Sequence, residues 1–235
     1  MNIDELRNWA KSKKASHIKD ILLPYAIIAL WEIIASQIVG AFSNIILSLL
    51  LNVAVNFVTF ILTIGSTIYM INFINEREYK IEVVWSKFKD AKDLIVTYLY
   101  YFGIIFVFSL LLIIPGIIKF FSYMLVPFIL ADPNNNLKDM DVLKKSEEIM
   151  NGHKMELFKI FLSFLPMHLL ACLTFGILEI WIFPEQQLVI TKYLSDLKDK
   201  AYGVTPQPLQ EPVPQQQTNT IKFCTSCGTQ VSGDT

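Results

Sequence analysis

The residues with the clearest chemical spacing in this chain are two cysteines near its C-terminus. Cys224 and Cys227 are separated by two residues and followed by Gly228, a spacing that lets two thiolates hold one tetrahedral metal ion. Structural zinc sites have four protein ligands, and no further cysteine pair follows in the sequence. The pair therefore leaves three alternatives open: zinc shared with a second chain or a protein partner, a vestigial or truncated site, or redox use.

A second group of residues forms a polar stripe inside a long apolar run, residues 45–74. Its hydroxyl and amide side chains recur at helical spacing and fall within about 100° of helix surface. They are Ser48, Asn52, Asn56, Thr59, Thr63, Ser66 and Thr67. Such a stripe will not face lipid, so it predicts either hydrogen bonds to neighbouring helices or the lining of a polar path. The candidate pathway residues are Asn52, Asn56, Thr59 and Thr63, together with Glu32, Lys119 and Glu179.

Ionisable side chains also lie inside the apolar runs, at Glu32, Lys119, His168 and Glu179. A charge at mid-bilayer costs on the order of 3 kcal/mol or more, so such groups pair, face other helices or stay neutral. Lys119 is expected to pair with Glu32 or Glu179, to extend to the membrane surface, or to join these acids in handling protons or a substrate. His168 and Cys172 lie one helical turn apart, and simple packing is expected there.

No arrangement typical of an enzyme stands out in the sequence. We find no phosphate-binding loop, no H-E-x-x-H motif and no pattern of serine, histidine and aspartate that suggests a nucleophile. His153 beside Lys154 is expected to be an interfacial polar group. The chain is therefore predicted not to be an enzyme.

The elements that must position these residues are apolar helices. Of the 235 residues, 53% are hydrophobic and only 17% are charged, whereas soluble domains carry about 25% charged residues. We predict an all-α, polytopic helical membrane bundle of about six segments in three hairpins. The expected partner is the lipid bilayer, and no nucleic acid is expected.

The predicted domains follow the distribution of charge and proline. They are a basic amphipathic helix on the membrane surface (1–20), a helical transmembrane domain (21–200), a Pro/Gln-rich disordered linker (201–221) and a short tail (222–235). The predicted segments are residues 21–39, 45–74, 94–114, 117–131 and a run, 157–194, that turns near 174–176. We expect Pro115-Gly116 to separate the third segment from the fourth, which is short enough to be re-entrant or tilted.

Lysine-rich segments predict the orientation of the chain. The N-terminal region and the loops 75–93 and 132–156 are rich in lysine, whereas the links within the hairpins carry no Lys or Arg. By the positive-inside rule, both termini are cytoplasmic and the protein crosses the cytoplasmic membrane several times. A short helix is also predicted in the second loop, capped by Asn136 and ended by Gly152, with Val142, Leu143, Ser146, Ile149 and Met150 on one side that faces the membrane or the bundle.

Two segments carry a resemblance to a known family. PGIIKFFSYMLVPFILAD (115–132) and KKSEEIMNGHKMELF (144–158) resemble the bacterial integral membrane family labelled domain of unknown function 975. The resemblance implies a multi-span helical membrane protein and no established activity. Met155 and Glu185 depart from the family pattern, which usually has an aromatic residue at the first position and an apolar or aromatic residue at the second.

The tail also carries a resemblance, and it shapes the functional hypothesis. KFCTSCGTQVSGDT (222–235) is similar to the first half of a bacterial zinc ribbon, so the tail is a candidate for zinc binding and for contact with a second chain or a protein partner. We expect a membrane-embedded interaction or envelope-homeostasis protein. The alternative is a small transporter or channel-like permease that uses the polar stripe.

Overall fold

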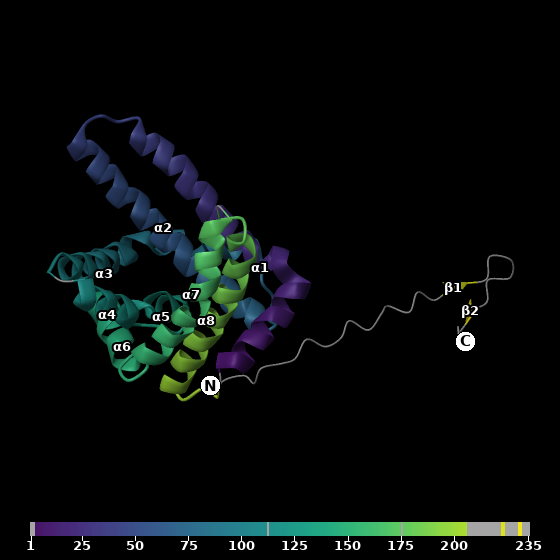
Figure 1. Ribbon diagram of the computed structural model, residues 1–235. Coiled ribbons are helices and arrows are strands. Elements are labelled where there is room, and N and C mark those ends of the chain that lie inside the picture. The colour runs from purple at the N-terminus through teal and green to yellow at the C-terminus, as the bar shows by residue number, and fades with distance from the viewer. Residues whose placement is uncertain (1–2, 112, 175, 206–221, 224–229, 232–235) are drawn as a thin grey trace.

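A computed structural model describes residues 3–111, 113–174, 176–205, 222–223 and 230–231 (Figure 1). Apart from one pair of very short strands, every regular element in these ranges is a helix, which confirms the predicted all-α class. The elements are α1 (Ile3–Gly40), α2 (Ile45–Ile74), the 3-10 helix η1 (Ile81–Asp90), α3 (Ala91–Leu111), α4 (Ile113–Tyr123), α5 (Val126–Ala131), α6 (Asp139–Ile149), α7 (Lys154–Leu173), α8 (Glu179–Ala201), β1 (Lys222–Phe223) and β2 (Gln230–Val231). The two strands pair antiparallel, with Lys222 opposite Val231.

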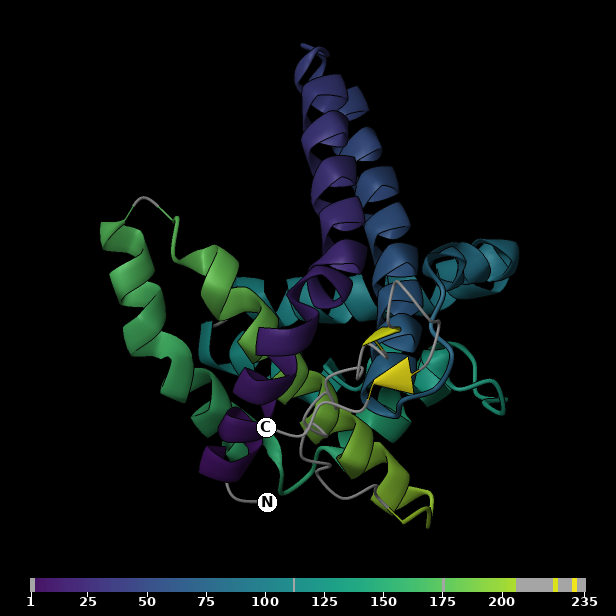
Figure 2. The ribbon, with the colours of Figure 1, turned by 90° about the vertical axis from the view of Figure 1, so that its right-hand side faces the viewer.

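The helices form three hairpins, α1–α2, α3–α4 and α7–α8, that diverge from one packed region (Figures 1 and 2). Figure 2 shows α1–α2 rising away from the bundle while α7–α8 leans to another side. Large apolar side chains cover the outer parts of all three hairpins. Among the most exposed are Leu30, Ile45, Ile46, Phe106, Ile114, Leu169 and Leu173.

The packed region holds most of the buried side chains, and we call it the base. It comprises residues 60–74, 121–131, 142–150 and 182–198. A close helix contact lies at Gly65 of α2, where a Cβ atom would overlap the carbonyl oxygen of Val84 in η1. Glycine therefore lets η1 pack directly on the backbone of α2.

Five helical stretches of the described residues are long and apolar enough to cross a membrane. They are Ile3–Gly40, Ile45–Ile74, Ile81–Ser109, Ile114–Ala131 and Lys154–Leu173. The sixth predicted segment, residues 177–194, lies mostly in α8 and is not among them, because it contains Glu179, Glu185 and Lys192. α8 contributes many buried residues to the base.

The break between the third and fourth predicted segments lies earlier than expected. α3 ends at Leu111 and α4 begins at Ile113, so Pro115 lies in the first turn of α4, where a backbone N–H is not needed within the helix. Gly116 packs against Ser109 of α3, and a Cβ atom added to this glycine would lie only 2.8 Å from the Ser109 hydroxyl oxygen. The predicted fourth segment is also two helices, α4 and α5.

The N-terminal segment is part of α1 rather than a separate helix. Helical structure runs from Ile3 to Gly40, interrupted by the non-helical dihedral angles of His17 (φ −132°, ψ 32°). Leu6 and Trp9 are buried against the rest of the protein, whereas this segment was predicted to lie on the membrane surface. The reason is that the first part of α1 packs against α8.

The predicted short helix is present as α6, but it begins at Asp139 and not next to Asn136. Its first N–H group, at Asp139, donates to the hydroxyl of Thr97 in α3 at 2.9 Å, so a neighbouring helix supplies the cap. Gly152 has a φ of +84°, the left-handed conformation that was predicted. The apolar side of α6 is buried as its spacing indicated.

Candidate functional site

The lysine-rich segments of the chain are joined beside the base by ion pairs between distant elements. The three pairs join the N-terminal part of α1 to the end of α2, the start of α3 to the loop before α6, and the end of α8 to the loop after α5. They are Lys13–Glu76 (2.7 Å), Lys138–Asp93 (3.1 Å) and Lys198–Asp132 (2.9 Å). The regions that were predicted to share one side of the membrane therefore lie at one end of the molecule.

A buried carboxylate joins α1 to α8. Glu185 is 1% exposed, and its two oxygens accept from Arg7 at 3.4 Å and from Lys14 at 2.9 Å. The Arg7 guanidinium also lies 4.5 Å from the centre of the Phe164 ring and donates to the carbonyl of Ser163 at 3.1 Å. One buried anion is thus matched by two cations from the same helix.

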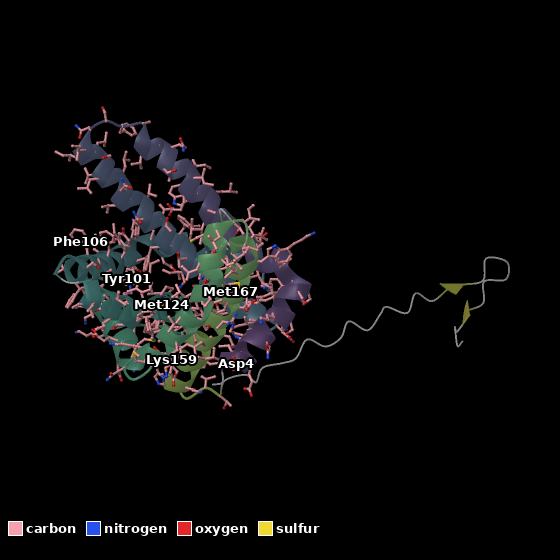
Figure 3. All side chains as sticks on the ribbon, viewed as in Figure 1. Asp4, Tyr101, Phe106, Met124, Lys159 and Met167 are labelled. Carbon is pink, nitrogen blue, oxygen red and sulfur yellow. The ribbon has the colours of Figure 1, made fainter. Side chains whose placement is uncertain are left out.

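A second polar group lies beside this cluster, between α7 and α8. The two ring nitrogens of His168 lie 3.1 Å from a carboxylate oxygen of Glu179 and 3.0 Å from the amide oxygen of Gln186. Met167 of α7, labelled in Figure 3, lies next to His168 and contacts Arg7 through its sulfur. The polar groups of α8 are therefore bonded to both α1 and α7.

A cavity of about 290 Å³ opens at the base between α6, the start of α7 and the end of α8. Within it, the Tyr193 hydroxyl donates to Glu156 at 2.7 Å, and the same carboxylate oxygen lies 3.2 Å from Nδ1 of His153. Asp196 and Lys200 complete its polar lining. An adjoining cavity of about 200 Å³ shares Glu156 and Tyr193 and reaches Lys159, the base-side residue of α7 labelled in Figure 3.

Two carboxyl groups near this end of the molecule have shifted pKa values in opposite directions. Burial raises the pKa of Asp196, against the opposing effect of the hydrogen bond from Lys192 at 2.8 Å. Burial also acts to raise the pKa of Asp132, but the hydrogen bonds from Lys198 and the Asn134 backbone outweigh it, so the pKa of Asp132 is lowered. Asp132 is therefore held ionised as part of a structural pair.

The predicted polar stripe of α2 makes most of its hydrogen bonds within its own helix. Asn52 and Asn56 donate to the carbonyls four residues earlier at 2.8 Å and 2.7 Å, and Thr63 donates to the carbonyl of Thr59 at 2.9 Å. Thr59 is the stripe residue that bonds to a neighbouring helix. Its hydroxyl donates to Glu32 and accepts from the indole N–H of Trp31 at 3.2 Å.

A cavity of about 470 Å³ lies beside the same hairpin, and every residue that lines it is apolar or aromatic. Its walls come from α1, α2 and η1, and they include Trp31, Leu62 and Trp85. Asn52, Asn56 and Glu32 do not line this cavity. This apolar cavity therefore does not support a polar path along the stripe.

Lys119 has a different partner from the two that were predicted. Its ammonium group lies 2.7 Å from Glu147 of α6 and over the rings of Phe108 and Tyr123, at 5.3 Å and 5.5 Å from their centres. The prediction of a pair with Glu32 or Glu179 is wrong, because α4 packs on α6 and brings Glu147 closer.

The predicted metal ligands, Cys224 and Cys227, lie outside the described residues, so zinc binding there stays a prediction. In the parts of the chain that the structure describes, no group of three or more His, Cys, Asp or Glu residues is placed to hold a metal ion. Cys172 is exposed, although packing was expected for it.

Two of these sites were not predicted. They are the cluster of Arg7, Lys14 and Glu185 and the cavity at His153. A signal for the first was present, because Glu185 replaces an apolar or aromatic residue of the family pattern and the N-terminal helix is rich in cations. No sequence signal places Tyr193 beside Glu156, since these residues are 37 positions apart and meet only through helix packing.

Comparison with known proteins adds one match. Residues 89–201 match the model of a family described as "Protein of unknown function (DUF975)". The matched region runs from the end of η1 through α8 and includes both segments that carried the resemblance, as well as the cavity at His153. No curated protein and no solved structure matches the chain.

Proposed function

We propose that this chain, related to that family through residues 89–201, is an integral membrane protein that acts as a membrane-embedded interaction protein without catalytic activity. Its three apolar hairpins anchor it in the bilayer. Its base presents polar loops and a cavity on one side of the membrane. We place the tail on the same side.

The observation that carries this proposal is the apolar surface of the hairpins. Leu30, Leu169 and Leu173 are 60%, 61% and 78% exposed, and many large apolar neighbours share their surroundings. Apolar patches of this extent on a protein in water would drive association, whereas in a bilayer they face lipid tails. The same hairpins contain the five stretches that are long enough to cross a membrane.

The interaction role is favoured over a permease by the way the polar groups are used. A transport path needs polar groups that face a common water-accessible space. Here Glu32 bonds to Thr59, and Asn52 and Asn56 bond to their own helix. The ion pairs of the base join structural elements to each other, which supports a scaffold.

The proposed orientation places the base and its lysine-rich loops in the cytoplasm, with α8 returning alongside α7 so that the chain crosses the membrane an even number of times. We would test it with single cysteines in a background where Cys172, Cys224 and Cys227 are serine. Glu78→Cys, in the exposed loop after α2, should resist a membrane-impermeant thiol reagent in intact cells. Ser43→Cys, in the exposed turn of the α1–α2 hairpin, should react. Labelling of Glu78→Cys from outside would contradict the orientation, and recovery of the protein in the soluble fraction would contradict membrane insertion.

For the tail, we propose zinc shared between two chains through Cys224 and Cys227 of each. Two thiolates per chain are half of a tetrahedral set, so the expected content is half an equivalent of zinc per chain. Metal analysis of the purified protein in reducing buffer, with Cys224→Ser as the matched variant, checks this. Absence of zinc from the unmodified protein would refute the shared site.

A further inference from the structure

The outer half of α2 presents two asparagines whose hydrogen bonding is only partly satisfied by the protein. Asn52 and Asn56 are both exposed, and each donates one N–H to the carbonyl four residues earlier. An asparagine amide has a second N–H and an oxygen with two lone pairs. No group in the described part of the chain bonds to these remaining atoms.

The surroundings of these amides are apolar and belong to a membrane-length helix. Ile45 and Leu49, seven and three residues before Asn52, share its face and are 82% and 64% exposed. In the hydrocarbon core no water is present to satisfy an amide, so an amide that faces lipid is costly. If α2 spans the bilayer as proposed above, another polar group must cover this face.

We propose that a second copy of this chain covers it, with the α2 helices packed about a two-fold axis and Asn52 and Asn56 bonded between the copies. Each amide has both a donor and an acceptor to spare, so an identical amide related by two-fold symmetry satisfies both at once. A two-fold interface places the same surface of each subunit against the other, which is the arrangement that self-complementary groups require. Interhelical amide bonds of this kind are used to associate helices in membranes.

The face also suits a helix better than a small molecule. Ile45, Leu49, Asn52 and Asn56 recur at intervals of three or four residues, which forms a continuous stripe along α2. Because the two amides bond to the backbone of their own helix, they are held in place before any partner arrives. The stripe is therefore a preformed, mixed polar and apolar surface that matches its own copy.

The first experiment is disulfide trapping with the full-length protein in lipid nanodiscs, in the background without Cys172, Cys224 and Cys227. Asn56→Cys should form a covalent dimer on mild oxidation. Ala54→Cys is the matched control, because it is exposed on the same helix but points about 160° away from Asn52 and Asn56. Equal trapping at both positions, or none at Asn56→Cys, would overturn the proposal.

The second experiment measures the monomer–dimer equilibrium of the purified protein by its mass in detergent. Replacing both asparagines by leucine removes four bonds per dimer, each worth about a 2.8-fold factor, so the dissociation constant should rise about 60-fold. Helix content should not change, since within each copy these side chains bond only to carbonyls of α2 itself. A wild-type protein that inserts into membranes but stays monomeric, or that associates through a different protein, refutes the dimer and leaves the proposed function standing.

Discussion

Polar side chains form different kinds of bonds in the base and in the outer half of the α1–α2 hairpin. In the base, polar groups bond across long stretches of chain, as Glu185 does with Arg7 and Lys14 of α1. In the hairpin, Asn52 and Asn56 bond to carbonyls four residues away. Local bonds keep a helix intact wherever it is placed, whereas bonds between elements hold one particular arrangement.

The difference indicates which parts of the molecule depend on each other. Removing one member of a buried ion pair leaves a charge without compensation, which is costly. Removing a side chain that bonds only to its own helix leaves no such group behind. Substitutions in the base should therefore have larger effects on stability than comparable substitutions in the hairpin.

The largest effect is expected at Glu185. Glu185→Ala leaves Arg7 and Lys14 without their carboxylate at a site where both are mostly buried, and it should lower the free energy of unfolding by about 3 kcal/mol. Equilibrium unfolding in detergent micelles measures this. Glu148→Ala, which removes an exposed pair with Lys145, is the control and should change stability by less than about 1 kcal/mol. Equal effects would show that the base is not held by its buried charge.

Two glycines extend the comparison to the α3–α4 hairpin. Gly65→Ala places a methyl group on the carbonyl of Val84 in η1, so we expect a loss of about 2 kcal/mol from overpacking. Gly103→Ala, in the α3–α4 hairpin, has no atom within 4 Å of the new methyl group and should stabilise the helix by about 0.5–1 kcal/mol. Thermal unfolding of both variants gives the sign of each change in stability, and opposite signs are expected. A stabilising Gly65→Ala would contradict the close contact between α2 and η1.

The pair of Asp132 and Lys198 predicts a dependence on pH. The pKa of Asp132 is lowered in the folded state, so its contribution is present above its ordinary value of 3.8 and is lost as the pH falls through the folded value. Asp132→Asn should cost about 1.5 kcal/mol at neutral pH and flatten the loss of stability below about pH 4. Unfolding measured across this range, with exposed Asp141→Asn as the control, checks both parts. An unchanged acid profile would contradict a structural role for the pair.

The smallest effect is expected for the threonines of the polar stripe. Thr59→Val removes the bonds to Glu32 and Trp31 of α1 and should cost about 1 kcal/mol, while Thr63→Val removes a bond within α2 and should be nearly neutral. Both variants keep the size of the side chain. Equal losses in unfolding experiments would mean that the stripe does not distinguish bonds between helices from bonds within one.

The sequence was informative where structure follows from local pattern. The apolar runs predicted the α1–α2 hairpin, and the spacing of apolar residues predicted the buried side of α6. Gly152 was identified as a left-handed position from its place after that helix. These features depend on residues within a few turns of each other.

The sequence was misleading where an outcome depended on packing between distant elements. Lys119 pairs with Glu147 because α4 packs on α6, and nothing in the spacing of either helix indicates that contact. Likewise, no local pattern indicates that Glu185, in the second half of the final apolar run, bonds to Arg7 and Lys14 of α1. Of the candidate site residues, Thr59 and Glu32 are brought together, while Lys119 and Glu179 are bonded elsewhere.

The bond between Arg7 and Glu185 also has a consequence for the order of biogenesis. These residues are 178 positions apart, so at typical synthesis rates of about 5–20 residues per second Arg7 emerges roughly 10 to 35 seconds before its partner. Throughout that interval the first hairpin exists without the carboxylate that neutralises its cations. The bundle is therefore completed only when the last hairpin is delivered, which makes the arrival of α8 the closing step of assembly.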